Sequence, residues 1–416
     1  MFDSGTSGLF IPSTNTTGDS WTNLKRLIRT LEQAGSAPSR IKDYLGEFLQ
    51  LTAVYETFEN MWEGYETMKQ ELEASFLQLS NNCADLTPLR MTGCIEGLCR
   101  DIRVELAHIQ YFSLIQQNNE ADNSWQLLTR YQRIQALLQG LIRNTDPSTW
   151  DAPDQGDLLG VLSPAYGGHE STQITARDSC MHPPEVRRLR NWMRGNPSGA
   201  VCWVPVTKQT GISHALCAEL DSIHKLGARF FFSSEISHLN SMVPSIARQL
   251  ANYSTPFRLA LSNSGLQTLP ESLDAQFEKL IVSPLASVRE ALPSHLAVVI
   301  DALDGCGSIR PILDAILAKS TNLPIKFFIF SRPESYHDTV DQLFVGEASR
   351  ECVLEGWDGE LEIALKPLGL SELQLTHLVQ RAAVLFACAS AATVANGIGD
   401  DTSWLESFAP FDNRQT

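Results

Sequence analysis

The organisation of the chain follows from residues 200–213, which read AVCWVPVTKQTGIS. Residues 200–206 form an apolar run of the length of a buried strand, and residues 206–213 lie in register with the phosphate-binding pattern Gly-x4-Gly-Lys-Ser. Gly211 and Ser213 match that pattern, whereas Val206 stands for its first glycine and Ile212 for its lysine. By itself this match is too weak to assign a site.

Three more short apolar runs follow, separated by stretches long enough for crossover helices. Such runs are typical of strands buried on both faces of a parallel sheet. The pattern therefore predicts an α/β fold with helices on both sides of a parallel sheet, a three-layer arrangement. The expected strands are Ala200–Val206, Arg229–Phe232, Leu296–Ile300 and Ile325–Phe330.

Polar side chains follow two of these runs. Asp301 and then Asp304 come after the third run, and Arg332 follows the fourth. We expect the strand before Gly211 to be central and the strand ending at Asp301 to be its neighbour. A carboxylate at the carboxyl end of a strand in an open α/β sheet can hold Mg²⁺ or its water.

The residues before this region have a helical pattern. Apolar side chains recur at steps of three and four, which places them on one stripe of each helix and predicts an antiparallel α-helical bundle. A structural or protein-contact role is the simpler interpretation, a ligand-binding role is the alternative, and a heptad-like seam leaves self-association open. The longest stripe comprises Leu51, Val54, Phe58, Met61, Tyr65, Met68, Leu72, Phe76 and Leu79.

Changes in composition divide the chain into five parts. We expect a flexible lead-in at 1–17, the α-helical bundle at 18–145, a linker at 146–176, the α/β domain at 177–345 and a C-terminal helical extension at 346–416.

The composition narrows the class of partner. Lys and Arg total 32 against 48 Asp and Glu, and the net charge of −16 opposes broad contact with nucleic acid or anionic lipid. Residues 1–5 lack the basic and apolar regions of a secretory signal, and nine cysteines without CxxC pairs indicate reduced thiols. We therefore expect a cytoplasmic protein that contacts other proteins through its helical bundle, and neither nucleic acid nor a membrane.

The order of several short motifs resembles fungal NACHT domains, the nephrocystin-3-like N-terminal class of STAND P-loop ATPases. The resemblance covers roughly residues 177–397 and is specific in its joint order. Its elements are Cys180, Pro183-Pro184, Trp203, the P-loop segment, Phe230-Phe231-Phe232-Ser233, Gln249-Leu250-Ala251, Gln276 to Ile281, Ile300 to Asp304, Phe330 to Glu334, and a closing helix at Leu385-Phe386-Ala387 and Ala391-Ala392-Thr393.

This resemblance implies an NLR-like switch that binds ATP or ADP with Mg²⁺ and changes its packing on exchange. It implies that Ser213 and Asp301 serve Mg²⁺, that Asp304 lies beside the attacking water as the catalytic residue, and that Arg332 senses the terminal phosphate. The implied nucleotide-binding segment comprises Lys208, Thr210, Gly211, Ile212, Ser213 and His214.

Three departures from the family pattern weaken the implied site. Val206 resists a positive φ, Ile212 removes the lysine, and Gly305 replaces the acidic residue after Asp304. Removing one partner of a close charge pair costs on the order of 2–5 kcal/mol, roughly 30-fold to a few thousand-fold in affinity. We expect ATP or ADP binding to be weak or lost, unless the flexible Lys208 side chain substitutes.

Each candidate also has a plain structural interpretation. Asp301 could be a solvated strand-end carboxylate, and Arg332 a structural ion-pair partner. The arginines at 187, 188, 190 and 194 are most simply the solvated face of a helix that buries Val186, Leu189 and Met193.

The function that we expect from the sequence is a NACHT-like regulatory nucleotide-binding module with an impaired P-loop, acting in signalling or self-recognition through protein contacts. The alternative is a nucleotide-independent scaffold, a pseudo-NTPase. A slow ATPase or GTPase comes last, because the lysine, the first glycine and the acidic residue at 305 are all missing.

Overall fold

A computed structural model describes residues 22–33, 65–84, 91–115, 120–149, 183–195, 198–205, 211–232, 239–264, 268–270, 272–301 and 310–331, with single positions at 41, 42, 46, 49 and 162. The chain divides into two compact units. The first comprises Met1–Met91 and Leu98–Trp150, and the second comprises Thr92–Gly97 and Asp151–Thr416.

The described part of the first unit is helical. It holds α1 (Thr22–Gln33), α3 (Tyr65–Ala84), most of α4 (Gly93–Ile115), α5 (Glu120–Thr145) and the short turn η1 (Pro147–Thr149). The expected apolar stripe is confirmed from Met68 onwards, because Met68, Leu72, Phe76 and Leu79 are all buried. The earlier positions of that stripe, 51 to 61, lie outside the described residues.

Polar contacts fix how α3 meets α5. The buried hydroxyl of Ser75 donates to the carbonyl of Glu71 at 2.7 Å and accepts from the amides of Gln135 at 3.0 Å and Gln139 at 2.9 Å. A buried hydroxyl with these partners carries no desolvation penalty, so the two helices are held in one register by satisfied hydrogen bonds.

The second unit alternates helices with strands. Its order is α7 (Pro183–Gly195), β1 (Val201–Pro205), α8 (Ile212–Ser222), β2 (Leu226–Phe231), α9 (Leu239–Tyr253), α10 (Thr255–Ser262), α11 (Leu273–Phe277), η3 (Glu278–Val282), α12 (Ser283–Ser287), η4 (Arg289–Ala291), β3 (Leu296–Asp301), α13 (Arg310–Ser320) and β4 (Ile325–Ser331). Four expected strands are therefore present, and β2 begins three residues earlier than its apolar run.

The four strands are parallel, in the order β1-β4-β3-β2. Val201 aligns with Phe327 between β1 and β4, and Val298 aligns with the same Phe327 between β3 and β4. This corrects the expected arrangement, since β1 lies at one end of the described sheet and β4 separates it from β3. The reason is that strand order depends on pairings between residues far apart in the chain, whereas burial does not distinguish the strands: Val201 to Val204 of β1 are buried, as is every residue of β4.

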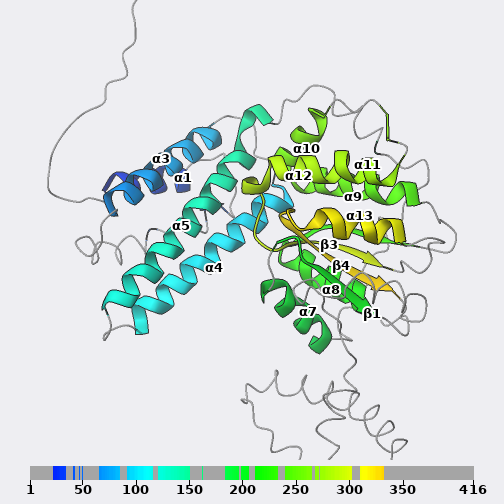
Figure 1. The fold of residues 1–416 in the computed structure, drawn as a ribbon. Coiled ribbons are helices and arrows are strands. Elements are labelled where there is room, and N and C mark those ends of the chain that lie inside the picture. The colour runs from blue at the N-terminus through cyan, green and yellow to red at the C-terminus, as the bar shows by residue number, and fades with distance from the viewer. Residues whose placement is uncertain are drawn as a thin grey trace, which may run out of the picture. The chain divides into compact units, whose positions relative to one another are not determined.

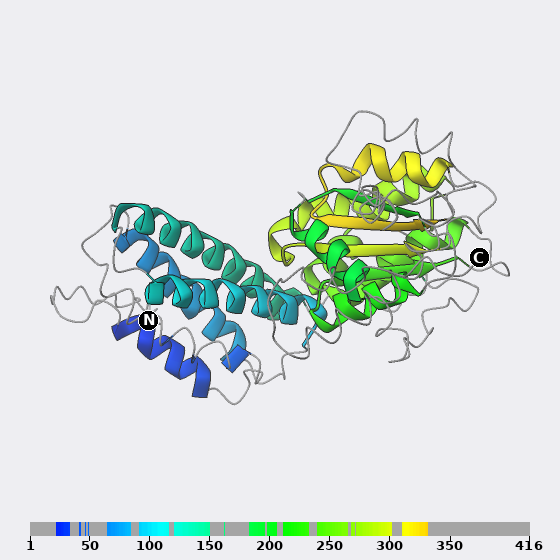
Figure 2. The same ribbon diagram turned by 90° about the horizontal axis from the view of Figure 1, so that it is seen from below.

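Helices cover both faces of the sheet (Figures 1 and 2), with α7 and α8 on one side and α9, α11 and α13 on the other. Parallel neighbours require crossover connections, and these place helices on the faces. The fold is therefore α/β with a parallel sheet in three layers.

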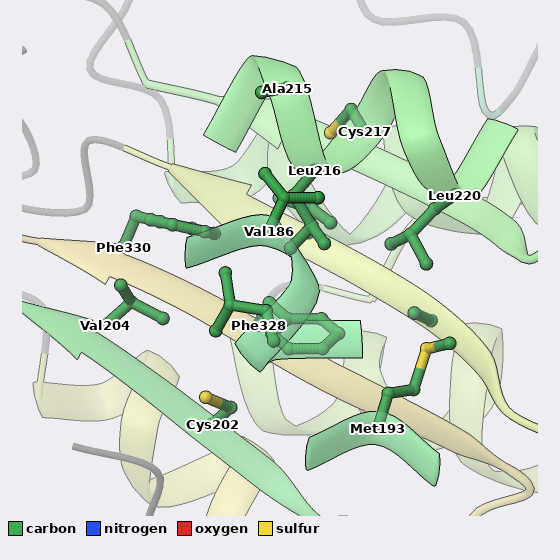
Figure 3. Packing of buried hydrophobic residues seen from close by; sticks show 13 residues of the cluster. Val186, Met193, Cys202, Val204, Ala215, Leu216, Cys217, Leu220, Phe328 and Phe330 are labelled. Carbon is green, nitrogen blue, oxygen red and sulfur yellow. The ribbon is translucent and has the colours of Figure 1, made fainter. Parts of the chain in front are cut away.

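The core between the sheet and the α7–α8 layer is apolar (Figure 3). Alternate residues of the strands point into it, and Val186, Leu189 and Met193 of α7 are buried there as the helical pattern predicts. The strand and α8 members are Cys202, Val204, Ala297, Val299, Phe328, Phe330, Ala215, Leu216, Cys217 and Leu220.

The arginines of α7 lie on the opposite side of that helix. Arg187 and Arg194 are exposed, while Arg190 donates to Glu219 of α8 at 2.6 Å. The expected solvated face is confirmed for Arg187 and Arg194, while Arg190 is half-buried and its ion pair with Glu219 joins α7 to α8.

Several sequence predictions lie outside the described residues: the lead-in at 1–17, nearly all of the linker at 146–176 and the extension at 346–416. Among the described residues no helix is long and apolar enough to cross a membrane. The five described cysteines, at 83, 94, 99, 202 and 217, are buried free thiols.

Candidate functional site

Gly211, which precedes α8, adopts a backbone conformation that favours glycine. Gly211 lies immediately before α8 with φ +70°, in the left-handed region, and its carbonyl accepts from the amide of Ala215 at 2.9 Å. No atom lies within 4 Å of the position that a Cβ would occupy. Glycine is therefore favoured here by the backbone angle and not by crowding.

The first turn of α8 is joined to the end of β3. The Ser213 hydroxyl donates a hydrogen bond to Oδ2 of Asp301, although the two residues are 88 positions apart in the chain. Ser213 is 5% exposed and Asp301 is half-buried. The structure thus brings together two residues that the sequence proposed for one site.

A third predicted residue lies beside this pair. His214 stacks on Phe231, the last residue of β2, with ring centroids 4.5 Å apart, and its Nδ1 is 3.5 Å from the Ser213 hydroxyl oxygen. The stacking orients the ring, while the long distance to Ser213 makes that contact weak. His214 therefore belongs to the same edge of the sheet without being tied to the Ser213–Asp301 pair.

Ile212 differs from what a phosphate site requires. It occupies the position of the expected lysine, is half-buried, and packs against the apolar cluster under α7 and α8. An aliphatic side chain supplies no positive charge for a phosphate. At this position the structure shows a core contact where a nucleotide site needs a cation.

Cys217 is one turn further along α8 and is fully buried. Burial raises the pKa of its thiol to about 12, the charge of Arg229 opposes that rise, and Asp301 adds to it. The thiol is therefore protonated at neutral pH, and since the thiolate is the nucleophile, Cys217 is not suited to nucleophilic chemistry.

The donor atoms at this edge suit a hard cation. The Ser213 hydroxyl and the Asp301 carboxylate are oxygen ligands of the kind that Mg²⁺ prefers. Within the described part of the chain, no group of three or more His, Cys, Asp or Glu side chains could hold a metal ion. The residues fit a magnesium site that uses few protein ligands, as magnesium sites with bound phosphates commonly do.

One contact was not foreseen from the sequence. The indole Nε1 of Trp203 donates to the hydroxyl of Ser331 at 2.7 Å, and both residues are buried. This bond joins the middle of β1 to the last residue of β4. A tryptophan in a strand signals a need for a polar partner, but the sequence could not say which residue provides it.

Four of the predicted site residues lie outside the described residues: Lys208, Thr210, Asp304 and Arg332. The same holds for Val206 and Gly305, two of the three departures from the family pattern. Their proposed roles stay predictions.

A comparison with protein-family models matches the α/β part of the second unit. Residues 180–332 match the family model described as Nephrocystin 3, N-terminal. This region is a nephrocystin-3-like domain. It runs from just before α7 to just after β4 and includes Gly211, Ser213 and Asp301. No curated protein and no solved structure matches the chain.

The resemblance noted in the sequence is therefore confirmed for the nephrocystin-3-like domain. The match covers the α/β part of the chain and leaves the helical first unit unassigned.

Proposed function

We propose that this protein is a NACHT-type regulatory module in which the nephrocystin-3-like domain keeps the frame of a nucleotide site but has lost most of its affinity. The observation that carries the proposal is the hydrogen bond from Ser213 on α8 to Asp301 on β3. It sets a hydroxyl and a carboxylate together at the carboxyl edge of a parallel sheet, where ligands of open α/β folds bind.

The residues of the proposed site supply some of the groups that ATP or ADP with Mg²⁺ would need. Backbone amides at the start of α8 favour an anion, and Ser213 and Asp301 are the residues that would hold Mg²⁺. When bound, the metal supplies positive charge beside the phosphates. In this chain Gly211 would provide the left-handed backbone before α8, and Ser213 and Asp301 would provide oxygen ligands. Ile212 provides no positive charge.

The missing charge sets the expected affinity. Loss of a partner from a close charge pair weakens binding by roughly 30-fold to a few thousand-fold. A site that would otherwise bind ATP at micromolar concentration then binds in the range from tens of micromolar to millimolar. A regulatory role survives only if the nucleotide still binds two conformations unequally.

A specific observation favours a second candidate, a nucleotide-independent scaffold. Ile212 packs against the apolar cluster and contributes to the core. An isoleucine at the position of the expected lysine stabilises the fold without a nucleotide. This is what we expect of a protein that acts only through contacts with other proteins. On either proposal the protein acts in the cytoplasm on other proteins through its helical first unit, in which the large apolar side chains of Leu77 and Val104 are 50% and 47% exposed.

Thermal unfolding of the full chain with ATP and Mg²⁺ separates the two candidates. With a Kd between tens of micromolar and about a millimolar, several millimolar ATP stabilises the fold by roughly 1–3 kcal/mol, so a rise in Tm at that concentration supports the weak switch. Absence of any rise supports the scaffold. Ser213→Ala provides the matched control, because it removes a proposed magnesium ligand and should abolish a genuine ATP-dependent rise.

Restoration of the loop tests whether the rest of the site is intact. Ile212→Lys combined with Val206→Gly should lower the Kd for ATP by at least tenfold, measured by calorimetry, if Ser213 and Asp301 still form a site. No gain in the double variant would show that the site has lost more than its charge. Steady phosphate release by the unmodified chain that disappears in Asp301→Ala would overturn both candidates in favour of a slow ATPase.

A further inference from the structure

The first residues of helix α4 belong to the second unit, although most of the helix belongs to the first. Thr92–Gly97 is part of the α/β unit, and the first unit resumes at Leu98. Thr92 caps the helix, because its hydroxyl accepts from the amide of Ile95 at 3.3 Å and its carbonyl accepts from the amide of Glu96 at 3.1 Å. One helix therefore begins in one unit and continues in the other.

Two glycines bring the backbone of this helix close to the α/β unit. Gly93 and Gly97 are four positions apart and so lie on one face of α4. A Cβ added to Gly97 would lie 2.8 Å from the backbone carbonyl oxygen of His224, and one added to Gly93 would lie 2.7 Å from Cδ2 of Tyr253. The hydroxyl of Tyr253 donates to the same carbonyl of His224 at 2.7 Å. The helix thus contacts these groups more closely than a side chain at either position would allow.

Side chains of the same six residues hold the segment in place. Oε2 of Glu96 lies 2.6 Å from Nε2 of His224, and the two side chains are 23% and 28% exposed. The thiol of Cys94 is buried and donates to the carbonyl of Ala291 at 3.3 Å. Ile95 is fully buried. Close packing, one partly exposed polar pair and burial therefore combine at a short contact.

These contacts lie at the opposite edge of the sheet from the proposed nucleotide site. His224 lies just before β2, and Ala291 lies in η4, just before β3. Ser213 and Asp301 meet where β3 ends. Because the strands are parallel, their starts and their ends form two separate edges. An inference about the start of α4 therefore does not depend on whether a nucleotide binds.

We propose that Thr92–Gly97 is a releasable anchor, which attaches the helical first unit to the nephrocystin-3-like domain by non-covalent contacts and frees that unit when it leaves its contacts. Contacts between domains of one chain resemble transient protein–protein interfaces. A segment of six residues with a partly solvent-exposed polar pair suits an equilibrium between an attached and a released form. The device controls when the helical unit is independent of the α/β domain.

A cut in the expected linker tests whether the anchor holds the two parts together. A protease site inserted after Gly156 in the full chain, cleaved once the protein has folded, yields one fragment with the first unit and Thr92–Gly97 and a second with the rest of the α/β unit. We expect the two fragments to elute together in size-exclusion chromatography. Titration of one labelled fragment with the other, followed by fluorescence anisotropy, then gives the Kd of the contact.

Gly97→Ala should raise this Kd at least tenfold. The added Cβ meets a backbone carbonyl, which cannot move aside as the end of a flexible side chain can. Alanine favours a helix more than glycine does, so α4 itself is not weakened. Far-UV circular dichroism of the uncut variant should therefore keep the helical signal of the unmodified chain.

Gly195→Ala is the matched control. Gly195 is the last residue of α7, and no atom lies within 4 Å of the position of an added Cβ. This variant should keep the Kd within twofold of the unmodified value. Ser213→Ala, at the other edge of the sheet, should leave the Kd equally unchanged, so that failure of the proposed nucleotide site and failure of the anchor are seen separately.

Glu96→Gln provides a second test that does not add volume. It keeps the shape of the side chain and removes its charge, and because the pair is partly exposed we expect a smaller rise in Kd, about threefold. Fragments of the unmodified chain that separate after cleavage overturn the proposal. So does a Kd that stays unchanged in both Gly97→Ala and Glu96→Gln, or one that rises equally in Gly97→Ala and Gly195→Ala.

Discussion

The buried side chain of Lys326 makes a testable prediction about how the stability of the second unit depends on pH. It lies in β4, is 1% exposed, and places its ammonium on the backbone carbonyl of Met193 near the end of α7. Its Nζ also lies 2.8 Å from Nδ1 of His295. Burial lowers the pKa of Lys326 from 10.5 to about 8.

The lowered pKa predicts a dependence of stability on pH with a definite sign. Between pH 8 and 10.5 the unfolded chain holds the Lys326 proton more often than the folded chain does, so this group makes stability rise with pH. A roughly 300-fold difference in proton affinity corresponds to about 3 kcal/mol, most of which falls between pH 7 and pH 10.

Lys326→Met isolates this contribution. Urea unfolding of both proteins, followed by tryptophan fluorescence at pH 7, 8, 9 and 10, should show the unfolding free energy of the wild type rising by roughly 2–3 kcal/mol relative to that of the variant across that range. Groups that titrate in both proteins, such as the thiols of Cys83 and Cys217, cancel in the difference.

Lys319→Met is the control, because hydrogen bonding to Asp274 raises the pKa of Lys319. Both its folded and its unfolded forms stay protonated below pH 10, so its difference from wild type should be flat. A flat result for Lys326 would refute the argument from burial. A loss of stability relative to the variant would show that the carbonyl of Met193 and the ring of His295 hold Lys326 as an ammonium.

Two further pairs of variants test the local geometry. Gly199 has φ +82°, and an added Cβ would collide with the backbone carbonyl of Ser320, whereas Gly211 has φ +70° and open space around it. In urea unfolding, Gly211→Ala should lower the free energy of unfolding by roughly 1–2 kcal/mol, the cost of a left-handed backbone, and Gly199→Ala should lower it by clearly more. Equal losses would contradict the crowding at Gly199. Trp203→Phe and Ser331→Ala each remove the bond between their side chains at a cost of about 1 kcal/mol, and a double-mutant cycle should find their effects non-additive; simple addition would mean that the bond contributes nothing.

The sequence predicts the strands of this fold better than it predicts their neighbours. Burial on both faces produces continuous apolar runs, and these identify β1, β3 and β4 to within a residue or two. The start of β2 is missed because Gly227 interrupts the pattern, although Leu226 pairs with Ala297 of β3. Pairing with a partner strand overrides the weak local preference.

The position of β4 between β1 and β3 is a property that no local pattern encodes. Each strand is apolar enough to lie inside the sheet, and the order depends on pairings between residues more than a hundred positions apart, such as Val201 with Phe327. The contact of Ser213 with Asp301 is nevertheless foreseen, because both residues follow from the rule that carboxyl ends of parallel strands share one edge.

The Lys326 contact and the Gln249 bonds could not be foreseen for a different reason. From the sequence, a lysine near the start of a strand is expected to be exposed at the strand end. Lys326 is buried only because α7 packs against the sheet there. From the sequence, a glutamine on a helix is expected to belong to the polar face of that helix. Gln249 bonds the main chain of Arg229 only because α9 packs close to β2. Both depend on which helix lies against which strand.

The described residues that we propose for a nucleotide site all have a structural role in the fold itself. Gly211 provides a backbone angle that other residues adopt with strain, and the Ser213–Asp301 bond fixes the first turn of α8 to the sheet. Ile212, at the position that has lost its charge, contributes to the apolar core. The presence of Gly211, Ser213 and Asp301 is therefore explained by the stability of the fold alone. A cation at position 212 is the feature that phosphate requires and the fold does not, so on the proposed function Ile212→Lys is the change that should raise the affinity for ATP without adding to the stability of the core.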